Sequence, residues 1–270
     1  MHLLITGAAG NVGTALRREF AATGWSLRLL DRLPVPDPLP HEQVLPGDIG
    51  DLPALVQAMQ GVDAVIHLAG CTTDAAIEEQ IDGNVRGAWQ VFEAARQAGV
   101  ARVVFASSHH VVGYYPRRRR IGTDVLLRPD SRYGLTKAFG EQVGALFADK
   151  YGLRVLCIRI GFLGERPIDP RRLSIWTSAR DLAQLVRIGL THATLRYAVV
   201  YGVSGNSRGF FDNQAAFALG YAPQDNAEDF AAEVLASAPP EDAALVGTHV
   251  VGGWGANNDF SGPVQRVFEW

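Results

Sequence analysis

Residues 3–13 have the sequence LLITGAAGNVG, a short apolar run that leads directly into a glycine-rich turn. The run predicts a buried strand and the residues after the turn predict a helix, so the glycines lie where one passes into the other. Glycines at such a junction let the backbone approach a pyrophosphate, whose charge is met by free N–H groups of the helix. The turn can also be purely structural, and its spacing alone does not decide the matter. The predicted contacts here are Gly7, Gly10, Asn11, Val12 and Gly13.

An acidic residue at the end of the second predicted strand complements the glycine turn. Asp31 follows Gly10 by 21 residues, where a carboxylate would bind ribose hydroxyls and repel a 2′-phosphate, which favours NAD over NADP. Arg32 leaves NADP open, because an arginine at this place can receive that phosphate. Asp48 and Ile49 follow the third predicted strand and are expected beside the adenine, although Asp48 equally suits a helix N-cap.

Short apolar runs alternate with longer amphipathic stretches up to about residue 150, which predicts βαβ units around a parallel sheet, a doubly wound α/β fold of Rossmann type. After Ile160 the pattern weakens, and the segment 161–176 is expected to help build a substrate pocket. We therefore expect a dinucleotide-binding domain over 1–160 and a small substrate-binding part, integrated with the sheet, over 161–270. The expected strands are 3–6, 26–31, 43–45, 64–68, 102–107, 154–160 and 195–201, and the expected helices are 12–22, 52–59, 77–98, 132–150, 178–192, 213–219 and 227–236.

The composition excludes several classes of protein. With 47% hydrophobic and 20% charged residues in a chain of 270, it is neither disordered nor a coiled coil. A net charge of −3 argues against a nucleic-acid partner, and no apolar stretch approaches the ~18 residues of a membrane span. Cys71 and Cys157 are too few for a disulfide framework, so a reducing, cytoplasmic compartment is expected. No metal is expected either, since His109 and His110 lack a third ligand at fitting spacing.

The second motif is Tyr133-Gly134-Leu135-Thr136-Lys137, on a predicted helix. Tyr133 and Lys137 lie four residues apart, hence on one helix face. A phenol with a reference pKa near ~10 is a useful base at neutral pH only where positive charge stabilises the phenolate. Such a pair also occurs on ordinary exposed helices. The Tyr133–Lys137 pair becomes significant together with Ser108, which follows the fifth predicted strand. Ligands of parallel sheets lie at the carboxyl ends of the strands.

In combination these elements resemble the short-chain dehydrogenase/reductase superfamily, in its extended, epimerase-like branch. The glycine turn, Asp31 and the Tyr133-x-x-x-Lys137 pair occur in the family's order. The resemblance implies bound NAD. Its remaining motif residues extend the predicted cofactor contacts to Leu68, Ala69, Gly70, Asn84, Tyr133, Lys137 and Ile160.

A closer resemblance, nearly end to end, is to uronate dehydrogenases. It rests on 105–116 (FASSHHVVGYYP), 128–130 (RPD), 159–161 (RIG), 173–176 (LSIW) and 211–213 (FDN). Those enzymes oxidise the C1 hydroxyl of a cyclic uronic acid to a lactone while NAD takes the hydride. The resemblance therefore implies an acidic sugar as substrate and a homo-oligomer. By matching positions it implies Tyr133 as general base, Lys137 as its electrostatic partner, Ser108 as hydrogen bond to the reacting hydroxyl, Arg171 at the acid group, and Thr72 and His110 at the substrate.

Three positions depart from the family's pattern. His109 stands where the family typically has Asn, Thr72 where it has Ser, and Phe162 where it has Ser after Arg-Ile-Gly. Phe162 removes a hydrogen-bond donor from the region expected to hold the carboxylate, while Arg172 adds positive charge there. A sulfonated sugar such as sulfoquinovose is therefore an alternative substrate. A nucleotide-sugar epimerase or dehydratase would use the same Tyr, Lys and Ser, but such enzymes usually have a longer C-terminal domain.

Overall fold

A seven-stranded parallel sheet runs through the centre of the computed structural model, which describes residues 1–72 and 75–269. Its strand order is β3-β2-β1-β4-β5-β6-β9. The chain adds strands outward from β1 to β3, then crosses back and adds the rest on the other side of β1, beginning with β4. The place between β1 and β4 is the topological switch point of a doubly wound fold. The fold expected from the sequence is confirmed. The strands are β1 (His2–Thr6), β2 (Ser26–Asp31), β3 (Glu42–Pro46), β4 (Ala64–His67), β5 (Arg102–Ser108), β6 (Arg154–Ile160) and β9 (Tyr197–Gly202).

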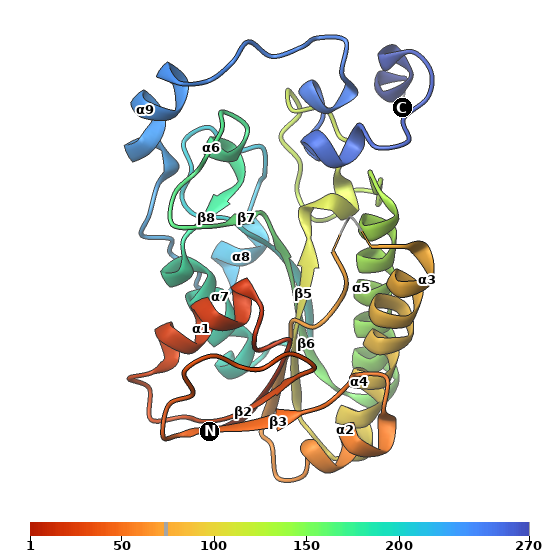
Figure 1. Ribbon diagram of the computed structural model, residues 1–270, viewed down its shortest axis with the longest axis vertical. Helices are drawn as coiled ribbons and strands as arrows, with labels where there is room; N and C mark the ends of the chain where they lie inside the picture. Colours follow the sequence, from red (N-terminus) through yellow and green to blue (C-terminus); the bar gives the residue numbers. More distant parts are fainter. Residues whose placement is uncertain (73–74, 270) are drawn as a thin grey trace.

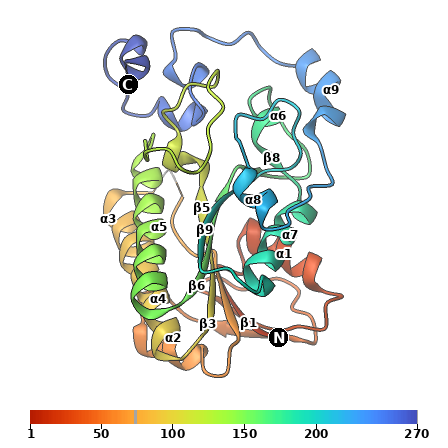
Figure 2. The same ribbon diagram turned by 180° about the vertical axis from the view of Figure 1, so that it is seen from behind.

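Helices cover both faces of this sheet (Figures 1 and 2). Helices α1 (Asn11–Phe20) and α7 (Ala179–Thr191) pack on one face, and α2 (Leu52–Ala58), α4 (Gly87–Gln97) and α5 (Arg132–Tyr151) pack on the other. Strand side chains alternate between the two cores, so Leu3 and Ile5 face α1 whereas Leu4 faces α4. Burial on both faces explains why central strands such as β1, β4 and β5 are largely continuous apolar runs, whereas the edge strand β3 is only partly buried.

The long helix expected over 77–98 is divided into three pieces. These are α3 (Ile77–Gln80), a π-helix over Ile81–Arg86, and α4. The π-helix holds Asn84, whose buried side chain turns away from the helix axis to bind a neighbouring loop. Sequence periodicity does not register such a local widening, which is frequent near functional sites.

A second layer, built from loops and short elements after β5, lies beyond the carboxyl ends of the strands (Figure 1). It contains the loop 113–131, the short pair β7 (Phe162–Leu163) and β8 (Trp176–Thr177), and α6 (Arg172–Ile175). The C-terminal segment 246–268 lies beside that loop through a bridge between Pro116 and Val250. Helix α9 (Ala231–Ala236) completes this part, whereas α8 (Gln214–Ala218) packs beside β9 in the main core. Because β9 pairs with β6, the residues after 160 also extend the sheet.

Candidate active site

The glycine turn joins β1 to α1 with no space for a side chain at Gly7 or Gly13. Gly7 has φ +73°, and a Cβ there would lie 2.6 Å from the backbone nitrogen of Ala69. At Gly13 a Cβ would lie 2.6 Å from the Ala8 carbonyl oxygen. Gly10 is the N-cap of α1, and among the described residues no side chain caps this helix. The N–H groups at the start of α1 are thus available to a phosphate-bearing ligand.

Asp31 closes the same corner from the end of β2. Its Oδ2 accepts a hydrogen bond from Ala9 N at 2.9 Å and its Oδ1 accepts one from Leu33 N, also at 2.9 Å. The backbone therefore fixes the carboxylate beside the turn, while each oxygen retains a further lone pair for a hydroxyl.

The neighbouring predicted cofactor residues have other contacts. Arg32 lies 3.7 Å from Asp48, with both side chains largely exposed, and Asp48 accepts from Gly50 N at 2.7 Å. The Ile49 side chain is buried against Gly87. The charge of the Arg32 guanidinium is thus partly balanced by the Asp48 carboxylate.

The loop after β4 lies opposite the glycine turn. Leu68 N donates to the Thr6 carbonyl oxygen at 3.0 Å, and Ala69 N donates to Thr6 Oγ1 at 3.4 Å. A Cβ on Gly70 would lie 2.5 Å from Asn84 Oδ1 and 3.5 Å from Lys137 Nζ. The loop therefore passes directly over the helix that carries Lys137.

Asn84 anchors the end of this loop. Its Oδ1 accepts from Cys71 N at 2.7 Å, and its Nδ2 donates to Cys71 O and to Thr136 Oγ1 at 3.2 and 3.0 Å. Asn84 thus joins the loop to α5. The next residue, Thr72, is exposed.

The Tyr, Lys and Ser expected to react are brought together above β5. Ser131 caps α5 by accepting from Gly134 N at 3.1 Å, which places Tyr133 in the first turn. Ser108 lies near the Tyr133 hydroxyl, where it acts on the pKa of the phenol as a hydrogen-bonding partner. Lys137 Nζ donates to the Ala106 carbonyl oxygen at 2.9 Å and lies 5.7 Å from the centre of the Tyr133 ring.

Burial shifts the pKa of both ionisable groups. It raises the pKa of Tyr133 to about 12, against the opposing effect of the Ser108 hydrogen bond. It lowers the pKa of Lys137 to about 8. The site therefore contains a protonated phenol and, below about pH 8, a cation beside it.

Two adjacent histidines follow Ser108. His109 Nδ1 lies 3.1 Å from the Ile160 carbonyl oxygen, and its Nε2 is enclosed with no partner among the described residues. Burial, followed by the electrostatic influence of His110 and Arg171, holds the pKa of His109 well below its usual range. His110 Nδ1 lies 2.7 Å from Asp130 Oδ2. His109 is therefore a neutral, buried ring, whereas His110 belongs to a carboxylate pair.

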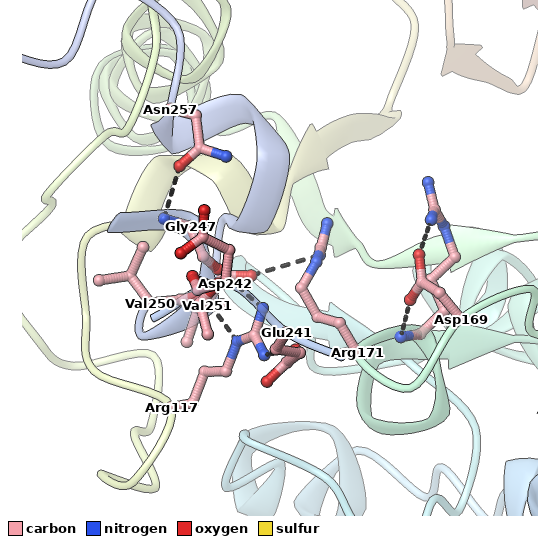
Figure 3. Close-up of polar contacts among 11 residues, drawn as sticks. Arg117, Asp169, Arg171, Glu241, Asp242, Gly247, Val250, Val251 and Asn257 are labelled. Carbon is pink, nitrogen blue, oxygen red and sulfur yellow. Dashed lines mark hydrogen bonds and ion pairs between the residues drawn. The ribbon is translucent and has the colours of Figure 1, made fainter. Parts of the chain in front are cut away.

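Arg171 supplies the cationic end of the site (Figure 3). Its Nη1 donates to the Val251 carbonyl oxygen at 3.3 Å. It runs past Gly253, where φ is +63° and a Cβ would lie 2.0 Å from Arg171 Nε. Burial, and then the charge of Arg172, lowers its pKa to about 10. Among the described residues no carboxylate lies within ion-pair distance of Arg171, so its guanidinium is available to an anion.

The Phe162 ring packs against a neighbouring cation. The guanidinium of Arg172 lies 4.5 Å from the centre of the Phe162 ring and forms an ion pair with Asp169 (Figure 3). The additional positive charge expected from Arg172 is thus balanced by a carboxylate. One of the two reasons for expecting a sulfonate, the charge of Arg172, is weakened accordingly.

Sequence reasoning assigned no role to Asp130 or to the glycines of the C-terminal segment. A Cβ on Gly252 would lie 1.6 Å from Asp130 Oδ2, and one on Gly255 would lie 2.9 Å from His110 Cε1. The signal that could have found them is the cluster of glycines at 252, 253 and 255, which suits close packing as well as an ordinary loop.

In the arginine run 117–120, Arg117 holds this C-terminal segment in place, and Arg120 contacts an earlier segment. Arg117 donates to the carbonyl oxygens of Val250 and Gly247 at 3.1 and 2.7 Å and pairs with Glu241 at 2.8 Å (Figure 3). Arg120 donates to the Phe211 carbonyl oxygen. At least these two arginines are structural.

Two findings concern the described residues as a whole. Nowhere in 1–72 and 75–269 do three His, Cys, Asp or Glu side chains form a group that could hold a metal ion. Within the same residues, no helix has the length and apolarity needed to cross a membrane.

Comparison with known sequences and structures fits this geometry. Residues 3–166 match the sequence model of the NAD dependent epimerase/dehydratase family. The chain belongs to this family. One family relative is the uronate dehydrogenase of Pseudomonas putida, which is 42% identical over 248 residues, 91% of this chain and 92% of its own.

Solved structures share the fold of this chain. Glucuronic acid dehydrogenase from Chromohalobacter salexigens superimposes with a TM-score of 0.91 at 36% identity, over 98% of each chain. A variant of uronate dehydrogenase from Agrobacterium tumefaciens, complexed with NAD, also gives 0.91 at 36% identity, over 97% of this chain and 99% of its own.

Proposed function

We propose that this chain is an NAD-dependent dehydrogenase that oxidises the C1 hydroxyl of an acidic hexopyranose of the uronate type to the lactone. The observation that carries the proposal is the pairing of two features in one site. Tyr133, Ser108 and Lys137 form a base with its partners, and Arg171 offers a cation with no carboxylate assigned to it. The uronate and glucuronate dehydrogenases to which the chain is similar support the same substrate class.

The residues of the glycine turn fit a dinucleotide. The closely packed Gly7 and Gly13 admit a pyrophosphate next to the uncapped start of α1, and Asp31 is oriented toward a ribose. We propose that residues 1–160 hold NAD and carry the reacting groups, and that residues 161–270 complete the substrate site with Arg171. When bound, NAD supplies the acceptor for the hydride.

Each site residue then has a task. Ser108 holds the C1 hydroxyl, and Tyr133 removes its proton as the hydride leaves the carbon. Lys137 stabilises the phenolate, which burial disfavours. Arg171 binds the acid group through charge-assisted hydrogen bonds and so fixes the sugar's orientation.

Arg171→Gln tests the assignment of the acid group. Without the guanidinium, the KM for glucuronate should rise about 10- to 100-fold, the effect of a lost charge-assisted hydrogen bond, with a smaller change in kcat. Arg172→Gln is the matched control, because Asp169 already balances that charge. Equal effects of the two substitutions would contradict the assignment.

We also propose that the chain forms a homo-oligomer through α5 and its neighbours. Leu135, Phe139 and Leu146 on α5 are 60%, 38% and 43% exposed, as are Ile81 (45%) and Trp89 (43%) nearby. Such a group of exposed apolar side chains suits a protein contact. Light scattering after size exclusion should give a multiple of 29.2 kDa for the wild type and a smaller species for Phe139→Glu.

A further inference from the structure

Asp130 and His110 form a carboxylate–imidazole pair that the proposed chemistry does not use. His110 Nδ1 lies 2.7 Å from Asp130 Oδ2, and Asp130 Oδ1 accepts from Ser131 Oγ at 2.8 Å. The His110 ring meets the Tyr133 ring edge-on, with 5.9 Å between the ring centres. The pair is therefore adjacent to the reacting groups.

The surrounding backbone is built around this carboxylate. A Cβ on Gly113 would lie 1.8 Å from Asp130 Oδ2, and one on Gly252 would lie 1.6 Å from the same atom. Gly252 N donates to Gly113 O at 2.8 Å, which closes the backbone over Asp130. The side chain of Asp130 is 0% exposed and that of His110 is 14% exposed. A ligand can thus reach the ring but not the carboxylate.

Hydrogen-bond chemistry then determines the form of the ring. A carboxylate oxygen accepts hydrogen bonds, so His110 donates from Nδ1 to Asp130, and a ring that carries one proton then has a free lone pair on Nε2. The Ile160 carbonyl imposes the same tautomer on His109. An acceptor nitrogen does not bind a carboxylate, but it does bind a hydroxyl, which can donate.

We propose that Asp130 is a positioning residue that fixes His110 with Nε2 as acceptor. His110, which the resemblance to uronate dehydrogenases already places at the substrate, would thereby accept a hydrogen bond from a ring hydroxyl other than the one that reacts. This inference rests on the proposed function: Ser108 and Tyr133 hold the reacting hydroxyl, and Arg171 holds the acid group. His110 adds a third point of recognition, which discriminates hydroxylated sugars from their deoxy analogues.

Nitrogen NMR of histidine-labelled protein tests the tautomer without any substrate. His110→Ala identifies the His110 signals by their loss. In the wild type we expect a protonated Nδ1 and an unprotonated Nε2, and in Asp130→Ala we expect proton occupancy to appear on Nε2. A wild-type Nε2 that carries a proton, or spectra that Asp130→Ala leaves unchanged, would overturn the proposal.

Kinetics test the recognition step. We compare kcat/KM for glucuronate with that for its deoxy analogues, each lacking one non-reacting ring hydroxyl. In the wild type one analogue should be poorer by about 10-fold or more, the effect of an unsatisfied polar group. That ratio should approach unity in His110→Ala and fall in Asp130→Ala, and the double variant should match His110→Ala.

The control is Asp225→Ala, which removes a carboxylate bound to Ser178 and Arg180 elsewhere and should leave the ratio unchanged. A merely structural role of Asp130 would lower turnover of every sugar equally and would add to the effect of His110→Ala, which overturns the inference. Failure of the proposed function is a separate result, because the wild type would then oxidise neither glucuronate nor any analogue.

Discussion

Lys137 Nζ lies 5.7 Å from the centre of the Tyr133 ring, one turn further along the same face of α5. Burial acts on the pair in opposite directions, because it raises the pKa of Tyr133 to about 12 and lowers that of Lys137 to about 8. Both shifts disfavour the charged form. The phenolate needed for proton removal therefore depends on positive charge close to the phenol.

Tyr133→Phe removes the base but keeps the ring. Turnover of an acidic sugar should fall by at least about 10²-fold, the usual contribution of general base catalysis. NAD binding, followed by quenching of protein fluorescence, should remain. A comparable loss of NAD binding would mean that the substitution had damaged the fold.

The rate of oxidation should depend on pH through both groups. Because Tyr133 acts only when deprotonated, kcat should increase as pH rises toward its pKa. Lys137 is charged below about pH 8 and loses its proton above it, so the increase should flatten there. In Lys137→Met the increase should move to higher pH, measured at saturating NAD. Superimposable profiles would exclude Lys137 as the partner of Tyr133.

Asp31 should determine the choice of cofactor. Asp31→Asn keeps an acceptor but removes the charge that repels a 2′-phosphate, so the preference for NAD over NADP in kcat/KM should fall about 10-fold or more. Arg32 is the control, since its side chain is 72% exposed and lies near Asp48. Arg32→Gln should leave the KM for NAD unchanged, and an increase in that KM would show that Arg32 binds NAD itself.

The doubly wound sheet was predictable because most strands are apolar runs followed by amphipathic stretches. The positions of Ser108, Tyr133 and Lys137 followed from the same pattern, since strand ends and helix faces follow from local sequence. The π-helix around Asn84 was not predictable, because it interrupts an otherwise continuous helical period.

The C-terminal wall of the site was not predictable either. Gly252, Gly253 and Gly255 contact Asp130, Arg171 and His110 only because the chain returns over the strand ends. Contacts between segments so distant in sequence carry no local pattern. The ion pair by which Asp169 balances the charge of Arg172 was not predicted, although the two residues are only three apart. Its geometry depends on the turn between them.

A buried ion pair beneath the site should dominate the effect of charge on stability. Arg159 makes two hydrogen bonds of 2.9 Å to Glu141, with the side chains 2% and 1% exposed. Glu141→Gln leaves the Arg159 cation without its counterion and should lower the free energy of unfolding by about 3–5 kcal/mol, measured by urea denaturation.

The control for this pair is Arg208→Met, because Arg208 and Glu228 form an ion pair at the surface. Surface pairs contribute little, so this variant should unfold at the wild-type urea concentration. The double variant Glu141→Leu with Arg159→Met should recover part of the lost stability. If Glu141→Gln unfolds like the wild type, the pair does not act as a buried unit.

The most direct test is to mix the purified protein with excess NAD and a limiting amount of glucuronate, galacturonate, sulfoquinovose or UDP-glucose, and to follow NADH by its absorbance. We predict one NADH for each molecule of glucuronate or galacturonate consumed, with sulfoquinovose poorer and UDP-glucose inactive. Sulfoquinovose turned over as well as glucuronate, or a sugar converted without net NADH as by an epimerase, would contradict the proposed function.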